Sequence, residues 1–187
     1  MDRLLLHSCC GPCTLYPLQA LREEGFEATG YFDNPNIHPY REFQARLSAY
    51  RLMADREGLE AETREDYGLS GFLGAIKALD DSAYQAVSEE RCRACYRLRL
   101  ERAAIVCKNA GLQVFTTTLL VSPYQRHDLI REIGEKIGEA YGLNFLYRDF
   151  RPGFRSGQAM AREMGLYMQG YCGCVFSEFE RYGGARK

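Results

Sequence analysis

Short apolar runs along the chain alternate with longer stretches in which apolar residues recur every three or four positions. The first run, Leu4–Leu6, stops at three cysteines, and Gly11-Pro12 marks a turn among them. Runs of this kind predict strands at residues 4–6, 26–32, 59–64, 112–120 and 143–147. Helical periodicity predicts helices at residues 14–25, 39–58, 71–79, 91–109 and 126–142, and a further one that starts at residue 156.

The segments between these elements are polar or contain turn residues. Residues 80–90 are expected to be a connection, and residues 148–157 a basic loop. Pro17 is compatible with its helix if it falls in or near the first turn. After Cys172-Gly173-Cys174, an amphipathic tail at residues 175–179 predicts a helical extension at the C-terminus.

Strands that alternate with helices predict an α/β fold, with a doubly wound parallel sheet of four or five strands between two helical layers. We expect a single domain over residues 1–187. Open sheets of this type bind ligands at the carboxyl ends of their strands. The first strand ends there at the cysteines, and residues 33–38 follow the second strand, so both segments are expected to line this crevice.

Composition and charge exclude several classes of protein. Of 187 residues, 46% are hydrophobic and 26% charged, and no apolar run approaches the ~20 residues that span a bilayer. Leu4–Leu6 is too short for the apolar core of a signal peptide. We therefore expect a cytoplasmic protein without a membrane anchor. The net charge of −1 gives no overall electrostatic case for nucleic acid.

Arginines nevertheless concentrate in two places. One group lies on the predicted helix 91–109, and the other precedes the C-terminal cysteines; the members are Arg91, Arg93, Arg97, Arg99 and Arg102, and Arg148, Arg151, Arg155 and Arg162. Such runs most often form a solvated helix face. A basic rim around a cysteine site is the open alternative.

Eight cysteines in a reducing compartment indicate metal ligands or redox-active thiols more than disulfides. Seven of them form three groups, namely Cys9, Cys10 and Cys13, then Cys92 and Cys95, then Cys172 and Cys174. Three groups far apart in sequence suggest one site gathered by the fold. Cys92 and Cys95 lie one helical turn apart and face the same direction, whereas Cys107 is predicted to be a core residue on the same helix.

The tetrapeptide Cys10-Gly11-Pro12-Cys13 is that of the thioredoxin active site. It comes too early in the chain for the elements that precede it in thioredoxins, and Cys9 adds a further thiol. A helix N-terminus beside the first cysteines favours the thiolate form in any case. A thioredoxin-like dithiol oxidoreductase remains an alternative.

Two kinds of metal site are also compared with the cysteine spacing. A radical-SAM cluster needs Cys-x3-Cys-x2-Cys, and Tyr16 stands where the third cysteine is required after Cys9 and Cys13. Two Cys-x2-Cys pairs could hold zinc, as in a zinc-stapled nucleic-acid-binding module without catalysis; they are Cys10, Cys13, Cys92 and Cys95. Zinc would leave three cysteines without a role.

An iron–sulfur cluster accounts for more of the thiols. A [4Fe–4S] cluster takes four thiolates, which Cys9, Cys10, Cys92 and Cys95 supply. Three soft groups then remain for a second metal, or for a pair that cycles between dithiol and disulfide; they are Cys13, Cys172 and Cys174. We predict that these seven residues form the metal and redox site.

Five motifs, in this order, resemble the epoxyqueuosine reductase QueH family over essentially the whole chain. They are HSCCGPC at 7–13, GYFDNPNIHP at 30–39, RCRACY at 91–96, TTLLVSP at 117–123 and QGYCGC at 169–174. The resemblance implies a HUP-type, Rossmann-like fold, a [4Fe–4S] cluster and reductive removal of the epoxide oxygen of epoxyqueuosine in tRNA. Some members carry Asp at the position of Cys13, so the resemblance implies that this residue is a variable ligand of a second, mononuclear iron.

The same resemblance implies a tRNA anticodon loop as partner and an external low-potential electron donor, and we expect a monomer. Candidates for phosphate contacts are Arg148, Arg151 and Arg155, and candidates for base stacking are Phe154 and Tyr171. A solvated loop explains these residues equally well. Asp33, Tyr31 or water could protonate the leaving oxygen, and His7 suits a neutral, backbone-bonded histidine as well as a catalytic one.

Overall fold

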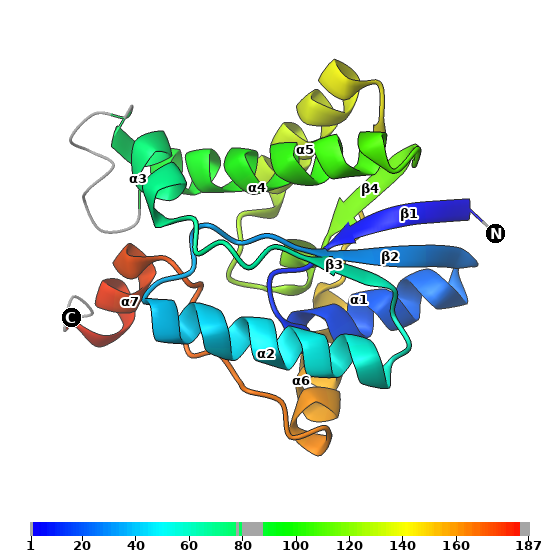
Figure 1. The fold of residues 1–187 in the computed structure, drawn as a ribbon, viewed down its shortest axis with the longest axis horizontal. Coiled ribbons are helices and arrows are strands. Elements are labelled where there is room, and N and C mark those ends of the chain that lie inside the picture. The colour runs from blue at the N-terminus through cyan, green and yellow to red at the C-terminus, as the bar shows by residue number, and fades with distance from the viewer. Residues whose placement is uncertain (1, 78, 80–87, 184–187) are drawn as a thin grey trace.

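Five parallel strands form the centre of the computed structural model, which describes residues 2–77, 79 and 88–183. The strands are β1 Asp2–His7, β2 Phe26–Phe32, β3 Ala61–Thr63, β4 Val114–Thr117 and β5 Asn144–Phe145. Their order in the sheet is β3-β2-β1-β4-β5, with every neighbouring pair parallel (Figure 1). The prediction of a parallel sheet of four or five strands is confirmed.

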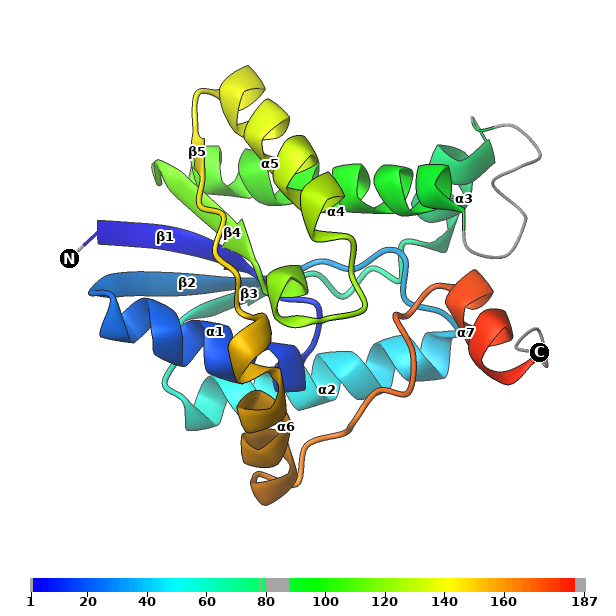
Figure 2. The ribbon, with the colours of Figure 1, turned by 180° about the vertical axis from the view of Figure 1, so that it is seen from behind.

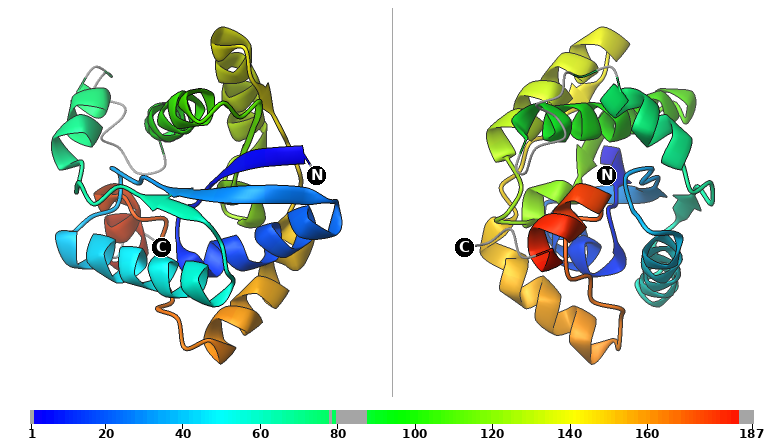
Figure 3. Two further views of the ribbon diagram at one scale, coloured as in Figure 1. Left: turned by 45° about the vertical axis from the view of Figure 1, so that its right-hand side comes forward. Right: turned by 90° about the vertical axis from the view of Figure 1, so that its left-hand side faces the viewer.

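Helices cover both faces of this sheet. Their bounds are α1 Gly11–Glu23, α2 Tyr40–Arg56, α3 Leu69–Lys77, α4 Glu89–Asn109, α5 His127–Tyr141, α6 Phe154–Glu163 and α7 Val175–Tyr182. Figures 2 and 3 show α1, α2 and α6 on one face and α4 and α5 on the other, with α7 as the predicted C-terminal helix. The three-layer α/β architecture is therefore confirmed. None of the helices in the described residues has the length and apolar character that crossing a bilayer requires.

β1 lies at the centre of the sheet, and both of its faces are covered. Leu4, Leu5 and Leu6 are at most 1% exposed, and Leu5 pairs with Thr29 of β2 on one side and Phe115 of β4 on the other. The strand order reverses between β1 and β4, so the chain leaves these two strands in different directions. In open α/β sheets, a crevice forms at this point beyond the carboxyl ends of the strands.

The first helix differs from its prediction. α1 begins at Gly11 rather than Thr14, with Cys10 as its N-cap, so Cys13 lies in its first turn. Pro17 stands in the helix interior, and the prediction that it lies in or near the first turn is wrong. Because proline has no N–H, it removes one hydrogen bond of the helix. Pro17 itself is buried against the core.

Two later segments also differ. β4 ends at Thr117, because the Thr117 hydroxyl accepts the N–H of Leu119 and turns the chain into a 3₁₀ helix, η2 Thr118–Val121. The expected loop 148–157 contains a 3₁₀ turn, η3 Arg151–Gly153, and the start of α6. Of the predicted connection 80–90, residues 80–87 lie outside the described residues.

Candidate metal centre

The first group of cysteines sits where β1 passes into α1. Cys10 caps the helix with extended backbone, and Pro12 is compatible with the first turn because its missing N–H would have no partner there. Cys9 is half-buried, whereas Cys10 and Cys13 are buried. The sulfur atoms of all three lie within 4.8 Å of one another, close enough to ligate one metal ion.

The pKa values of these three thiols are shifted in different directions. Bonds from the thiols of Cys10 and Cys13, and one of 3.4 Å from the Thr118 hydroxyl, hold the pKa of Cys9 well below its usual range. Burial raises the pKa of Cys10, and hydrogen bonding to the other two thiols raises that of Cys13. The Gln169 amide donates to both of these sulfur atoms, at 2.9 and 3.0 Å. Of the three sulfur atoms, that of Cys9 therefore most favours the thiolate form that a metal requires.

The other four cysteines are electrostatic neighbours of one another. Burial raises the pKa of Cys92 to about 11 and that of Cys95 to about 12, and the thiols of Cys172 and Cys174 add to both shifts. Cys95 and Cys174 are buried together with Phe72 and Ile76 of α3, while Cys172 is exposed. The fold thus brings the cysteines of α4 beside those of the C-terminal segment.

The Cys172-Gly173-Cys174 turn is held mainly through its backbone. Arg46 of α2 donates from its guanidinium to the carbonyl oxygens of Tyr171 and Cys172, at 2.9 and 3.1 Å. The backbone N–H of His38 donates to the Gly173 carbonyl at 2.7 Å. Gly173 has a φ of +126°, a conformation that favours glycine. These contacts orient the two flanking thiols.

Arg99 of α4 is the second buried arginine at the site. It is 1% exposed, lies over the ring of Tyr96 at 5.7 Å and donates from Nε to the Cys95 carbonyl at 3.2 Å. Burial disfavours its charge, yet the nearby thiols of Cys95, Cys172 and Cys9 raise its pKa. Arg99 is therefore close to both the N-terminal trio and the other cysteines.

Polar side chains support the ends of the strands beneath the thiols. His7 Nδ1 and Thr117 Oγ1 are 2.8 Å apart, and His7 Nε2 lies 3.4 Å from the Asp33 carbonyl oxygen. The Asp33 carboxylate accepts from Tyr31 at 2.9 Å and pairs with Arg102 at 3.1 Å. His7 is thus placed as a structural group with a carbonyl partner, and Asp33 and Tyr31 are bonded to each other.

Burial of His7 makes the stability of the fold depend on pH. Desolvation lowers the pKa of His7 from 6.5 to about 4, so in acid the unfolded chain takes up a proton before the folded one. Between pH 7 and pH 5 this linkage removes about 2 kcal/mol of stability. Glutamine cannot titrate, so between pH 7 and pH 5 the free energy of unfolding of His7→Gln should fall by about 2 kcal/mol less than that of the wild type. Chemical denaturation at the two pH values measures this difference. An equal decline in both proteins would contradict a neutral His7.

The donors present fit an iron–sulfur group. Thiolates are the soft ligands that bind iron–sulfur clusters and zinc. Cys9, Cys10 and Cys13 lie close enough to share one metal, whereas Cys92, Cys95, Cys172 and Cys174 lie near one another without forming such a group among the described residues. Arg99 Nη2 is buried without a hydrogen-bond partner, and no carboxylate in the described part of the chain pairs with Arg99. A buried cation requires a nearby negative charge, which a thiolate-bound metal group would supply.

Three residues shape this site in ways that the sequence analysis does not predict. The prediction that Arg99 lies on a solvated helix face is wrong: it is buried, as is Arg91. Its spacing of four from Cys95 puts both on one face of α4, a signal that could have identified it. Arg46 similarly lies on the apolar face of α2, and Gln169 is the first residue of the C-terminal motif. Cys107 is buried in the core and bonds to backbone carbonyls, as predicted.

Two solved structures resemble this fold. A predicted subunit of tRNA methyltransferase from Methanocaldococcus jannaschii superposes with a TM-score of 0.54 and 10% identity, over 87% of this chain and 75% of that one. The U34-tRNA thiolase NcsA from Methanococcus maripaludis, solved with its [4Fe-4S] cluster, gives 0.52 and 13%, over 95% and 62%. At these identities, the likeness shows the fold alone.

Sequence comparison is more specific. A family model described as Epoxyqueuosine reductase QueH matches residues 4–180. The chain is 35% identical to epoxyqueuosine reductase QueH of Dehalococcoides mccartyi, over 97% of this chain and 95% of that protein. It is also 35% identical to the protein of that name from Thermotoga maritima, over 97% and 93%. This chain therefore belongs to the epoxyqueuosine reductase QueH family.

Proposed function

We propose that this protein is an oxidoreductase that converts epoxyqueuosine in tRNA to queuosine with the aid of an iron–sulfur cofactor. The observation that carries the proposal is the family match over residues 4–180, together with the thiols that the fold gathers beside β1. Removing an epoxide oxygen to leave an alkene consumes two electrons and two protons and releases water. A low-potential external donor would supply the electrons.

We assign the thiols to two sites. Cys9 and Cys10, with Cys92 and Cys95, are proposed to bind a [4Fe–4S] cluster. Cys13, Cys172 and Cys174 are proposed to form the second site, which holds a mononuclear iron or cycles between dithiol and disulfide. When bound, the iron–sulfur group supplies electrons one at a time, and an adjacent iron acts as a Lewis acid toward oxygen.

The residues of the chain would prepare this chemistry in three ways. The pKa of Cys9, held low by neighbouring hydrogen bonds, favours the thiolate that a metal requires. Arg46 donates to the backbone carbonyl oxygens of the C-terminal turn and so orients Cys172 and Cys174 toward the site. Phe72 and Ile76 of α3 exclude water from Cys95, which strengthens electrostatic interactions there.

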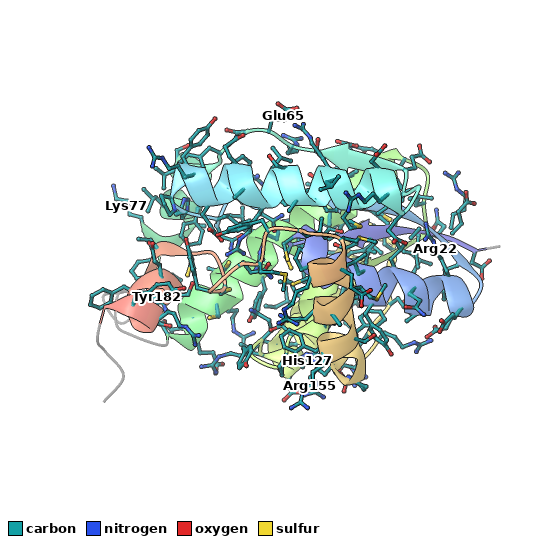
Figure 4. All side chains as sticks on the ribbon, turned by 90° about the horizontal axis from the view of Figure 1, so that it is seen from below. Arg22, Glu65, Lys77, His127, Arg155 and Tyr182 are labelled. Carbon is teal, nitrogen blue, oxygen red and sulfur yellow. The ribbon has the colours of Figure 1, made fainter. Side chains whose placement is uncertain are left out.

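The tRNA surface is proposed to include Arg155 rather than the whole basic loop. Arg148 pairs with Glu24 at 2.7 Å, and Arg151 pairs with Asp149 at 2.6 Å, so neither charge is free. Arg155 is exposed, points outward at the edge of the molecule (Figure 4), and has no ion pair within the described residues.

Aromatic rings adjoin this arginine. Phe154 packs edge-to-face with Tyr124, which is 84% exposed and available to stack on a base. Tyr171, the other predicted stacking residue, donates from its hydroxyl to the His38 carbonyl and lies beneath the Arg46 guanidinium. The ring of Tyr171 is therefore committed to holding the C-terminal segment.

Arg155→Glu tests this surface. Because the substitution removes a phosphate contact and reverses the charge, it should weaken tRNA binding roughly three- to tenfold and lower the salt dependence by about one released counterion. Fluorescence anisotropy with labelled tRNA at several salt concentrations measures both. Arg3→Glu, at the amino end of the sheet, is the control for the change in net charge. Equal weakening by the two substitutions would exclude a local role for Arg155.

The function itself is tested with purified components. The protein, purified anaerobically, is analysed for iron, labile sulfide and zinc, and then incubated with dithionite and tRNA that carries epoxyqueuosine. We expect four irons with sulfide, surplus iron at the second site, and queuosine among the digested nucleosides. Stoichiometric zinc with no product would instead support the zinc-stapled binding module. A colourless protein that reduces disulfides would support a thioredoxin-like enzyme.

A further inference from the structure

The charge of Arg99 is unusual because no carboxylate in the described part of the chain pairs with it. Its side chain is 1% exposed, and its only hydrogen bond there runs from Nε to the Cys95 carbonyl oxygen. Nη2 is buried and unpartnered. An isolated buried cation is strongly unfavourable in a protein interior. The arrangement therefore indicates that a negatively charged group completes the site.

The other buried charges near the site are already paired. Arg46 is 2% exposed, but Glu42 accepts from its Nε at 2.7 Å, and two carbonyl oxygens take the rest of the guanidinium. The buried carboxylate of Asp33 pairs with Arg102 on α4, not with Arg99. The sulfur atoms of Cys95, Cys172 and Cys9 act most strongly on the charge of Arg99, and the Tyr96 hydroxyl adds to their effect.

We propose that Arg99 is a positioning residue whose positive charge compensates the thiolate-bound metal group and makes that group easier to reduce. The inference rests on the proposed iron–sulfur cofactor. Such a group becomes more negative when it takes an electron from a reductant, with no bond made or broken. A fixed cation in a water-excluded pocket stabilises the reduced form more than the oxidised form.

The helix geometry supports this role. Arg99 follows Cys95 by one turn of α4 and is buried on the same face, so its guanidinium lies near the Cys95 thiol. The contact with the Tyr96 ring and the bond to the Cys95 carbonyl limit the movement of the guanidinium. Its charge is therefore fixed in place before a metal group binds.

Three variants of the full chain test the proposal. Arg99→Met removes the charge with little change in volume, Arg99→Lys keeps the charge, and Arg97→Met removes an exposed charge from the same helix. Each is reconstituted anaerobically, assayed for iron and sulfide, and titrated with dithionite and redox mediators while the reduced cluster is followed by electron paramagnetic resonance. Arg99→Met should lower the equilibrium constant for one-electron reduction at least tenfold, or about 59 mV.

Arg99→Lys should recover most of that loss, and Arg97→Met should titrate like the wild type. Failure of Arg99→Met alone to retain iron, with retention in Arg99→Lys, also supports a role for the charge. An unchanged midpoint in Arg99→Met, or loss of iron from both Arg99 variants, overturns the proposal in favour of a packing role. A wild-type protein without iron would refute the proposed cofactor, and the role of Arg99 with it.

Discussion

Replacing Cys92 by serine should abolish both the brown colour of the protein and its activity. Cys92 lies one turn before Cys95 on α4 and is proposed to ligate the [4Fe–4S] cluster. A serine hydroxyl is a hard donor that stays protonated near pH 7, so it does not replace a thiolate. We expect iron and sulfide to fall to background, and queuosine formation to drop by more than the roughly 10- to 100-fold typical of residues that only support ligands.

Cys107→Ser is the matched control, because Cys107 lies on the same helix but outside the site. Its thiol is buried in the core and donates to the carbonyl oxygens of Leu112 and Val114, which a hydroxyl can also do. This variant should keep its iron and most of its activity. A brown, active Cys92→Ser protein would end the assignment of Cys92 to the cluster.

Gly173→Ala should remove activity while the cluster stays in place. Gly173 has a φ of +126°, and an added Cβ would meet Arg46 Nη1 and Ile37 Cγ1, both at 3.2 Å. The turn must then shift, and Cys172 and Cys174 shift with it. Misplacement of reacting groups by about 1 Å can lower a rate by about 100-fold. We expect a loss of this size in product formation, with near-normal absorbance from the [4Fe–4S] cluster.

Gly165→Ala is the matched control, because it introduces backbone strain without crowding neighbouring atoms. Gly165 also has a positive φ, +65°, but nothing lies within 4 Å of an added Cβ. We expect a stability loss of roughly 1–2 kcal/mol in denaturant titrations, with activity unchanged. Full activity in Gly173→Ala would show that the turn need not be held closely. If Gly173→Ala instead lost its cluster iron, Cys172 and Cys174 would be assigned as ligands of the cluster.

The layers of the fold could be predicted from sequence because burial repeats along each element. The continuous apolar run Leu4–Leu6 predicts a strand covered on both faces, and α2 carries apolar residues at helical spacing. Boundaries were less predictable because single side chains set them. The Thr117 hydroxyl ends β4 by accepting a backbone N–H, and nothing in the β-branched run that contains it indicates this.

The cysteines of the site could be named from their grouping, but their electrostatic surroundings could not. Arginines are usually exposed, so composition assigns Arg99 and Arg46 to the surface. Both are buried because α2 and α4 flank the ends of the strands, a relation that depends on tertiary packing. Likewise, Arg148 pairs with Glu24, a residue far away in sequence that only the folded chain brings close.

Arg46 binds the C-terminal turn through the carbonyl oxygens of Tyr171 and Cys172, and every amino acid provides such an oxygen. The anchor at Cys172 is thus independent of its side chain, whereas the Cys174 sulfur also accepts the Ser177 N–H at the start of α7. Position 172 could accept a carboxylate or imidazole ligand without losing its anchor. A protein engineer could therefore replace a metal-binding side chain in this turn, and so change which metal is preferred, while the backbone stays in place.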